Sequence, residues 1–203
     1  MPTSPAKIKE KLERFTTGRE LVQVTRRLKG ADRLEGFLVG HGERWVLLHL
    51  VTPHGFSLDG YVAVRTVDIK SCKRWGKEHG SFPSRCLAYF GEIPVVPRGI
   101  DLSRTHRLIV TAAARWPLLT LFVENDDPDV CFVGQPVSVS SRRLRLLPIS
   151  PAAQWQEEPI RYDLRDVTRV QFGGRYEEAL YALGNGDGAG TGTAQKQSPA
   201  GHW

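Results

Sequence analysis

The sequence predicts a mainly β protein built as two tandem small β-barrels with short flanking helices. Three observations favour this fold class. Short runs of strand-like residues recur at a spacing of about 8–12 residues between turn signals, which is typical of small barrels and sandwiches. The second half of the chain repeats the order of the first. Residues 184–203 are almost entirely small or polar, so the folded part ends before them.

The first half begins with a short amphipathic helix and continues with five expected strands. Ile8, Leu12 and Phe15 have helical spacing in an otherwise charged segment, and Gly18 follows as a stop signal. A short helix over residues 85–92 would close this unit. The strands are expected at residues 21–28, 33–40, 44–51, 60–65 and 67–72.

The second half shows the same succession of elements about 98 residues later. Leu48 matches Leu146 and Asp68 matches Asp166, since 146 − 48 and 166 − 68 both equal 98. Similarity at a fixed period indicates a repeated unit. Residues 102–116 fit either a helix or a strand. Strands are expected at residues 118–125, 130–134, 136–141, 142–150 and 160–172, with a closing helix at 175–184.

These patterns divide the chain into two units, a linker and a tail. The first unit, with its N-terminal helix, is expected over residues 1–93 and the second, with its closing helix, over residues 104–183. Proline and glycine in residues 94–103 are typical of a linker between them. Residues 184–203 hold too little apolar surface to offset the entropy of ordering, which predicts a disordered tail.

The expected strands resemble the Sm-like small barrel, a bent five-stranded structure of the SH3-like type that follows a short helix. The resemblance lies in EGFLVGHGERWVLLHLV and YVAVRTVDI, and again in VSSRRLRLLPIS and YDLRDVTRV. Gly36 would be the glycine that lets a strand bend. Arg65-Thr66-Val67 and Leu164-Arg165-Asp166 stand where that family has its Ile-Arg-Gly signature, so its uridine pocket does not transfer. In layout, the chain also resembles uncharacterised actinobacterial proteins.

Composition predicts a soluble, cytoplasmic protein with no membrane partner. Of the 203 residues, 40% are hydrophobic and 25% are charged, which is ordinary for a globular protein. No apolar run approaches the roughly 18 residues of a membrane span, and the charged N-terminal residues do not resemble a signal peptide. Cys72, Cys86 and Cys131 do not have the number or spacing of a disulfide scaffold.

No motif in the sequence indicates catalysis, a metal site or a cofactor. The closest metal-like spacing, Cys72-x6-His79-x6-Cys86, is not that of a zinc site. There is no Gly-x-Ser-x-Gly turn of the kind that holds a nucleophilic serine. Glu177 and Glu178 fall in the first turn of an expected helix, where carboxylates stabilise the helix dipole. We therefore expect a non-enzymatic protein with no catalytic residue, no metal and no cofactor.

The formal net charge of +6 suggests two kinds of partner, and the sequence specifies no oligomeric state. We expect a binding protein that recognises an unknown protein partner through a barrel edge or the surface between the units. The alternative is nucleic acid, RNA in particular, bound through basic segments beside Trp75; an enzyme of unknown class ranks third. The candidate nucleic-acid-binding residues are Arg26, Arg27, Lys29, Lys70, Lys73, Arg74 and Lys77. A further basic group, Arg142, Arg143 and Arg145, is expected on the solvated barrel surface.

Overall fold

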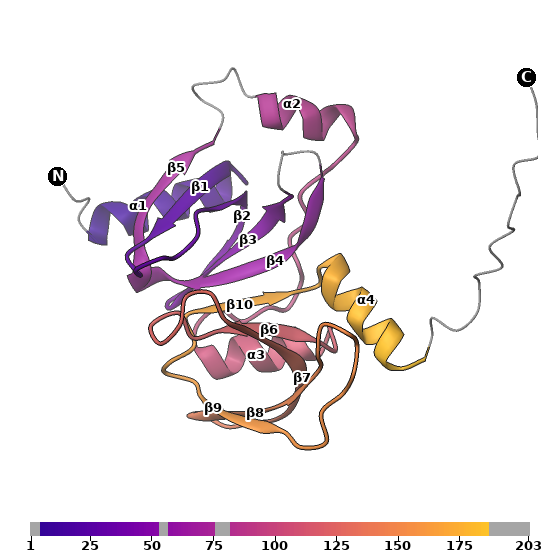
Figure 1. The fold of residues 1–203 in the computed structure, drawn as a ribbon. Helices are drawn as coiled ribbons and strands as arrows, with labels where there is room; N and C mark the ends of the chain where they lie inside the picture. Colours follow the sequence, from indigo (N-terminus) through magenta and orange to yellow (C-terminus); the bar gives the residue numbers. More distant parts are fainter. Residues whose placement is uncertain (1–4, 53–56, 76–81, 187–203) are drawn as a thin grey trace, which may run out of the picture.

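The computed structural model describes residues 5–52, 57–75 and 82–186, which fold into one antiparallel sheet with helices packed around it (Figure 1). The helices are α1 (Pro5–Thr17), α2 (Phe82–Tyr89), α3 (Thr105–Ala113) and α4 (Arg175–Gly184). The strands are β1 (Leu21–Arg26), β2 (Leu34–His41), β3 (Trp45–Val51), β4 (Leu58–Arg65), β5 (Ile69–Arg74), β6 (Leu119–Phe122), β7 (Cys131–Val139), β8 (Arg143–Pro148), β9 (Ile160–Asp163) and β10 (Arg169–Phe172). The fold is therefore mainly β, as the sequence predicts.

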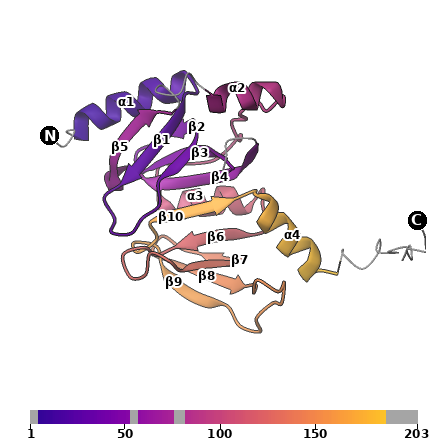
Figure 2. The ribbon, with the colours of Figure 1, turned by 45° about the horizontal axis from the view of Figure 1, so that its top comes forward.

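The two halves of the chain place their strands in the same order. The order is β5-β1-β2-β3-β4 in the first half and β10-β6-β7-β8-β9 in the second. The halves join where β10 pairs with β4, with Tyr61 opposite Phe172 and Val64 opposite Arg169. Figures 1 and 2 show β4, β10 and β6 running side by side through the middle of the molecule. One continuous sheet thus spans both halves.

Strand registers recur at the offset found in the sequence. Gly36 lies opposite Leu50 in the β2–β3 pair, and Gly134 lies opposite Pro148 in the β7–β8 pair; 134 − 36 and 148 − 50 both equal 98. Both pairs then shift register two residues beyond the glycine. A Cβ atom at either glycine would overlap a carbonyl oxygen of the facing strand. Each half therefore needs glycine at the same place, where one strand closely approaches its neighbour.

The hydrophobic core is shared between the halves. Leu12 of α1 packs with Val46 and Leu48, which lie on one face of β3. Trp45 and Leu47 lie on the opposite face, where they join a cluster that contains α3 and strands β6, β8 and β10 of the second half. Because β3 is covered on both faces, nearly all of its residues are buried, which explains why its sequence is almost continuously apolar.

The sheet does not close into the two expected barrels. A closed barrel in the first half would need β4 to pair with β5. In the structure β4 pairs with β10 of the second half, and β5 and β9 lie at the two edges of the sheet. The arrangement also suits the core, because side chains of β3 and β4 pack in one cluster with side chains of the second half. Strand spacing indicates local pairing but does not indicate which strand edges finally meet, which is why the sequence predicts closed barrels.

Several element boundaries also differ from the expectations. Residues 130–134 and 136–141 form the single strand β7, because a register shift within a strand replaces the expected turn. Residues 160–172 form two strands, β9 and β10, that lie at opposite ends of the second half. The ambiguous segment 102–116 contains the helix α3. The expected disordered tail overlaps the end of α4 by one residue, Gly184, and most of it lies outside the described residues.

The segment expected to be a linker, residues 94–103, is bound to the first half. The Val95 N–H donates to Nδ1 of His49 at 3.2 Å, and the Tyr61 hydroxyl donates to the Val95 carbonyl oxygen at 3.2 Å. Burial lowers the pKa of His49, and the nearby carboxylates of Glu92 and Asp59 oppose this only in part. Since Nδ1 accepts a hydrogen bond, His49 is neutral in this contact.

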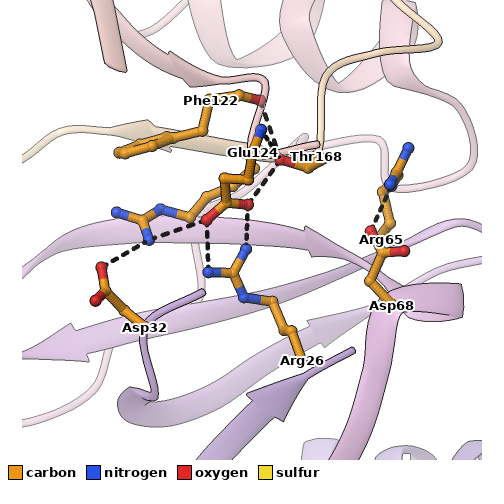
Figure 3. Close-up of polar contacts among 8 residues, drawn as sticks. Arg26, Asp32, Arg65, Asp68, Phe122, Glu124 and Thr168 are labelled. Carbon is orange, nitrogen blue, oxygen red and sulfur yellow. Dashed lines mark hydrogen bonds and ion pairs between the residues drawn. The ribbon is translucent and has the colours of Figure 1, made fainter. Parts of the chain in front are cut away.

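A buried charge cluster also joins the halves (Figure 3). The Arg26 guanidinium, at the end of β1, donates two hydrogen bonds to the carboxylate of Glu124, just after β6, one of them at 2.7 Å. The Thr168 hydroxyl lies 2.7 Å from the same carboxylate, and Nη1 of Arg169 lies 3.6 Å from it. Burial raises the pKa of Glu124, but these hydrogen bonds and positive charges outweigh it, so the net shift is downward.

We predict that Arg26→Leu destabilises the protein by about 3–5 kcal/mol, because it leaves the buried Glu124 carboxylate without its main partner. Urea unfolding would measure the change. Arg33→Leu is the matched control: Arg33 is 60% exposed and pairs with Glu35 at 3.2 Å, so it should cost less than about 1 kcal/mol. The double variant Arg26→Leu, Glu124→Leu should regain part of the loss, since the buried carboxylate is gone and Arg169 keeps its ion pair with Asp32 at 3.6 Å. Equal losses in the single variant and its control would contradict the assignment.

We predict that His49 makes stability depend on pH below about 6.5. Its folded-state pKa lies below the ordinary value of about 6.5, so protonation favours the unfolded state. The stabilisation is complete above pH 6.5 and is lost as pH falls toward the folded-state pKa. His49→Asn keeps an acceptor but does not titrate, so its urea midpoint should fall less between pH 7 and pH 5 than that of the wild type. Parallel pH profiles of the urea midpoint for the wild type and His49→Asn would contradict this role. Burial also lowers the pKa of His41, but His41 is present in both proteins and contributes equally to their profiles.

Candidate anion-binding site

A pocket of about 610 Å³ lies where the two halves meet, a volume within the usual range for small-molecule sites. Its lining comes from four segments that are far apart in the sequence. One precedes β3, one begins α3, one is the β7–β8 turn and one follows β9. The lining residues are Arg44, Arg104, Thr105, His106, Ser141, Arg142, Arg143, Asp163, Leu164 and Arg165. Five of these ten residues are arginines.

Backbone hydrogen bonds bring these segments together. The N–H groups of Arg44 and Trp45 both donate to the carbonyl oxygen of Leu102, at 3.3 and 3.1 Å, and so fix the β2–β3 turn beside the start of α3. The Leu164 N–H donates to the Arg142 carbonyl oxygen at 2.8 Å, which fixes the β7–β8 turn beside the end of β9. The backbone positions of Arg44 and Arg142 are therefore set by these hydrogen bonds and not by contacts of their own side chains.

Positive charge in the pocket is only partly compensated. Asp163 is its one lining carboxylate, and it lies 3.9 Å from both Arg143 and Arg165. Arg165 also lies 3.5 Å from Asp166. Arg44, Arg104 and Arg142 have no ion pair with any residue in the described part of the chain. Crowded, exposed guanidinium groups of this kind are suited to binding an anion.

The start of α3 adds to the positive potential of the pocket. Arg104 is the N-cap, with extended φ and ψ of −145° and 152°, and its side chain makes no capping hydrogen bond. The first backbone N–H to bond within the helix is that of Leu108, which donates to the Arg104 carbonyl oxygen at 2.9 Å. The earlier N–H groups of the helix have no intrahelical acceptor. They lie at the positive end of the helix dipole, where anions are stabilised.

Of the residues that sequence reasoning selected for nucleic-acid binding, Arg26 cannot serve. Its side chain is 0% exposed and is bound to Glu124, because the end of β1 faces the second half. Arg74 is exposed but forms an ion pair with Glu20. Lys77 lies outside the described residues, as does His79 of the rejected zinc pattern.

Three of the other selected residues lie on or beside the edge pair β1–β5. Strand β5 pairs with β1, and Nε of Arg27 donates to the Ile69 carbonyl oxygen at 3.3 Å. Lys29 follows in the turn after β1, and Lys70 and Lys73 are exposed on β5. The structure thus places Arg27, Lys70 and Lys73 on or beside the β1–β5 pair, and none of the selected residues that it describes lines the arginine pocket.

Sequence reasoning missed the arginine pocket except for Arg142 and Arg143, which it noted as one basic group among several. Arg44, Arg104 and Arg165 are single residues in different segments, and no local spacing joins them. One signal was present: Arg44 and Arg142 are 98 residues apart (142 − 44), so they occupy the same turn in the two halves. A repeat comparison that considers charged turn residues could have selected this pair.

Comparison with other proteins adds no assignment: no family model, curated protein or solved structure matches the chain. Within residues 5–52, 57–75 and 82–186, no three or more histidine, cysteine or acidic side chains are grouped as a metal site would require. Over the same residues, no helix has both the length and the apolar character needed to cross a membrane. The arginine pocket is therefore the feature that indicates a function most directly.

Proposed function

We propose that the protein is a non-enzymatic binding protein that holds a phosphate-bearing ligand in the arginine pocket between its halves. The observation that carries the proposal is the convergence of five arginines on one pocket, three of them without an acidic partner in the described chain. Guanidinium groups bind phosphate through paired, charge-assisted hydrogen bonds. The free N–H groups at the start of α3 provide further donors for the same anion.

Recognition between the halves fits the structure better than strand addition at a sheet edge. The free edge strands β5 and β9 carry exposed charged residues, among them Lys70, Lys73 and Arg161. Charged side chains, lysine above all, discourage pairing of an edge with another chain. A protein partner, which the sequence favours, would then contact the pocket through a phosphorylated or similarly anionic group.

We also propose that the two halves are duplicated units of the Sm-like or SH3-like type, opened and merged into one sheet, in a cytoplasmic protein. The shared strand order and the recurring registers support the duplication. The backbone gives further support: Thr66 donates to the Arg44 carbonyl oxygen as Leu164 donates to that of Arg142, both at 2.8 Å. The same turn geometry therefore recurs 98 residues later.

We predict that inorganic tripolyphosphate binds the wild-type protein in 50 mM salt and binds the Arg104→Gln, Arg142→Gln double variant at least about tenfold more weakly, since two charge-assisted contacts are lost. Isothermal titration calorimetry would measure both. Arg85→Gln is the matched control, because Arg85 is an exposed arginine on α2, away from the pocket lining. Absence of binding to the wild type, or equal weakening in the control, would refute the proposal.

RNA binding at the β5 edge is a second candidate function, favoured by Arg27, Lys70 and Lys73, which lie on or beside the paired strands β1 and β5. We predict that Lys70→Gln, Lys73→Gln weakens binding of a single-stranded RNA and lowers the slope of log K against log salt by about 1.4, two charges at about 0.7 each. Fluorescence anisotropy at several salt concentrations would measure this. Retention of the slope in the variant, or no binding at 50 mM salt, would exclude this edge as the RNA site.

A further inference from the structure

The pocket contains one arginine from the same turn of each half. Arg44 precedes β3 and Arg142 precedes β8, and each backbone carbonyl accepts a 2.8 Å hydrogen bond from the equivalent residue of its own half, Thr66 or Leu164. Both side chains line the pocket, and neither has an ion pair with a described residue. Of the pocket arginines, Arg44 alone comes from the first half. Two equivalent cationic groups thus approach the same space from different halves.

The charge of the pocket exceeds that of a single phosphate. The lining holds five arginines and one aspartate, and Asp166 beside Arg165 adds a second carboxylate, which leaves a balance of +3 (5 − 2). A phosphate monoester carries about −1.5 to −2 at pH 7, so one such group would leave the surplus half compensated. Two phosphate groups carry about −3 to −4, which matches the pocket. A pocket of about 610 Å³ has room for both, since a water molecule takes about 30 Å³ of the liquid.

The lining favours the phosphates over any base attached to them. It includes no phenylalanine, tyrosine or tryptophan, and stacking of a nucleic-acid base normally needs such a platform. The polar groups that remain, from Thr105, His106 and Ser141, are short-range hydrogen-bonding partners suited to phosphate oxygens. Recognition would therefore reside in the linked phosphates themselves.

We propose that the ligand of the pocket contains two linked phosphate groups, a diphosphate, that bridges the halves between Arg44 and Arg142. This inference depends on the proposed function, because it specifies the ligand of the same pocket. The diphosphate is either free inorganic pyrophosphate or part of an ester such as a nucleoside diphosphate. In both cases Arg44 contacts the second phosphate and gives the site its preference for two phosphates over one.

The test compares orthophosphate, pyrophosphate and ADP by isothermal titration calorimetry against the wild type, Arg44→Gln and the control Arg85→Gln. Pyrophosphate or ADP should bind the wild type and Arg85→Gln at least about tenfold more tightly than orthophosphate. Arg44→Gln should weaken the binding of pyrophosphate about tenfold more than it weakens the binding of orthophosphate, and so remove that preference. If ADP binds no more tightly than pyrophosphate, the free inorganic ion is sufficient as the ligand. If ADP binds about tenfold more tightly, the ligand is a diphosphate ester.

The outcomes separate this inference from the proposed function. Equal affinity for orthophosphate and pyrophosphate overturns the diphosphate and leaves a phosphate-binding pocket. Absence of binding by all three ligands, with tripolyphosphate also inactive, overturns both. Binding of single-stranded RNA that depends on Arg44, without binding of pyrophosphate, replaces the diphosphate by a nucleic-acid backbone. Circular dichroism of Arg44→Gln confirms that it folds, which is expected because Arg44 is exposed and its backbone makes the contacts that fix the turn.

Discussion

The contact between Arg26 and Glu124 is the constraint on which the arrangement of the halves depends. Glu124 is 3% exposed and belongs to the second half, whereas its main partner ends a strand of the first. A buried carboxylate is costly unless its oxygens are fully bound, so docking in which Arg26 and Glu124 do not meet is strongly disfavoured. Nonpolar side chains tolerate small sliding movements of the two halves, but a bidentate ion pair does not. We interpret the cluster as the element that selects one docking geometry.

That selection bears directly on the pocket. Arg44 belongs to the first half, whereas the other pocket arginines belong to the second, so the spacing between guanidinium groups follows from how the halves are docked. The β4–β10 pairing, the cluster around Glu124 and the hydrogen bonds from the β2–β3 turn to Leu102 act at separate points of the same junction. Together they hold the backbone of the segments that carry the arginines in place before a ligand arrives, which reduces the ordering cost of binding.

The sequence predicts the local structure well and the global pairing poorly, for a physical reason. Helical spacing and alternation report which side of an element is buried, and they correctly indicate α1 and most of the strands. They do not report what covers that side. The run WVLLHLV, residues 45–51, is apolar at nearly every position, and this signals a strand covered on both faces rather than the wall of a small barrel. The expectation that Arg26 is exposed and binds nucleic acid is wrong for the same reason. A charged residue at a strand end is usually solvated, and the sequence around it does not show that another part of the chain covers it.

The pocket is formed once, where the two halves meet, and most of its charged residues have no equivalent in the other half. Under the proposed duplication, Arg104 and Thr105 correspond to Ala6 and Lys7, where α1 begins, since 104 − 98 and 105 − 98 are 6 and 7. Arg165 likewise corresponds to Val67. Only the turn arginines, Arg44 and Arg142, are common to both units. The remaining positive charge is concentrated at the junction, where the start of α3 meets the turn of the preceding half. Charge that accumulates at one junction and is only partly compensated by acidic side chains there does not stabilise the fold, so a ligand is its most direct explanation.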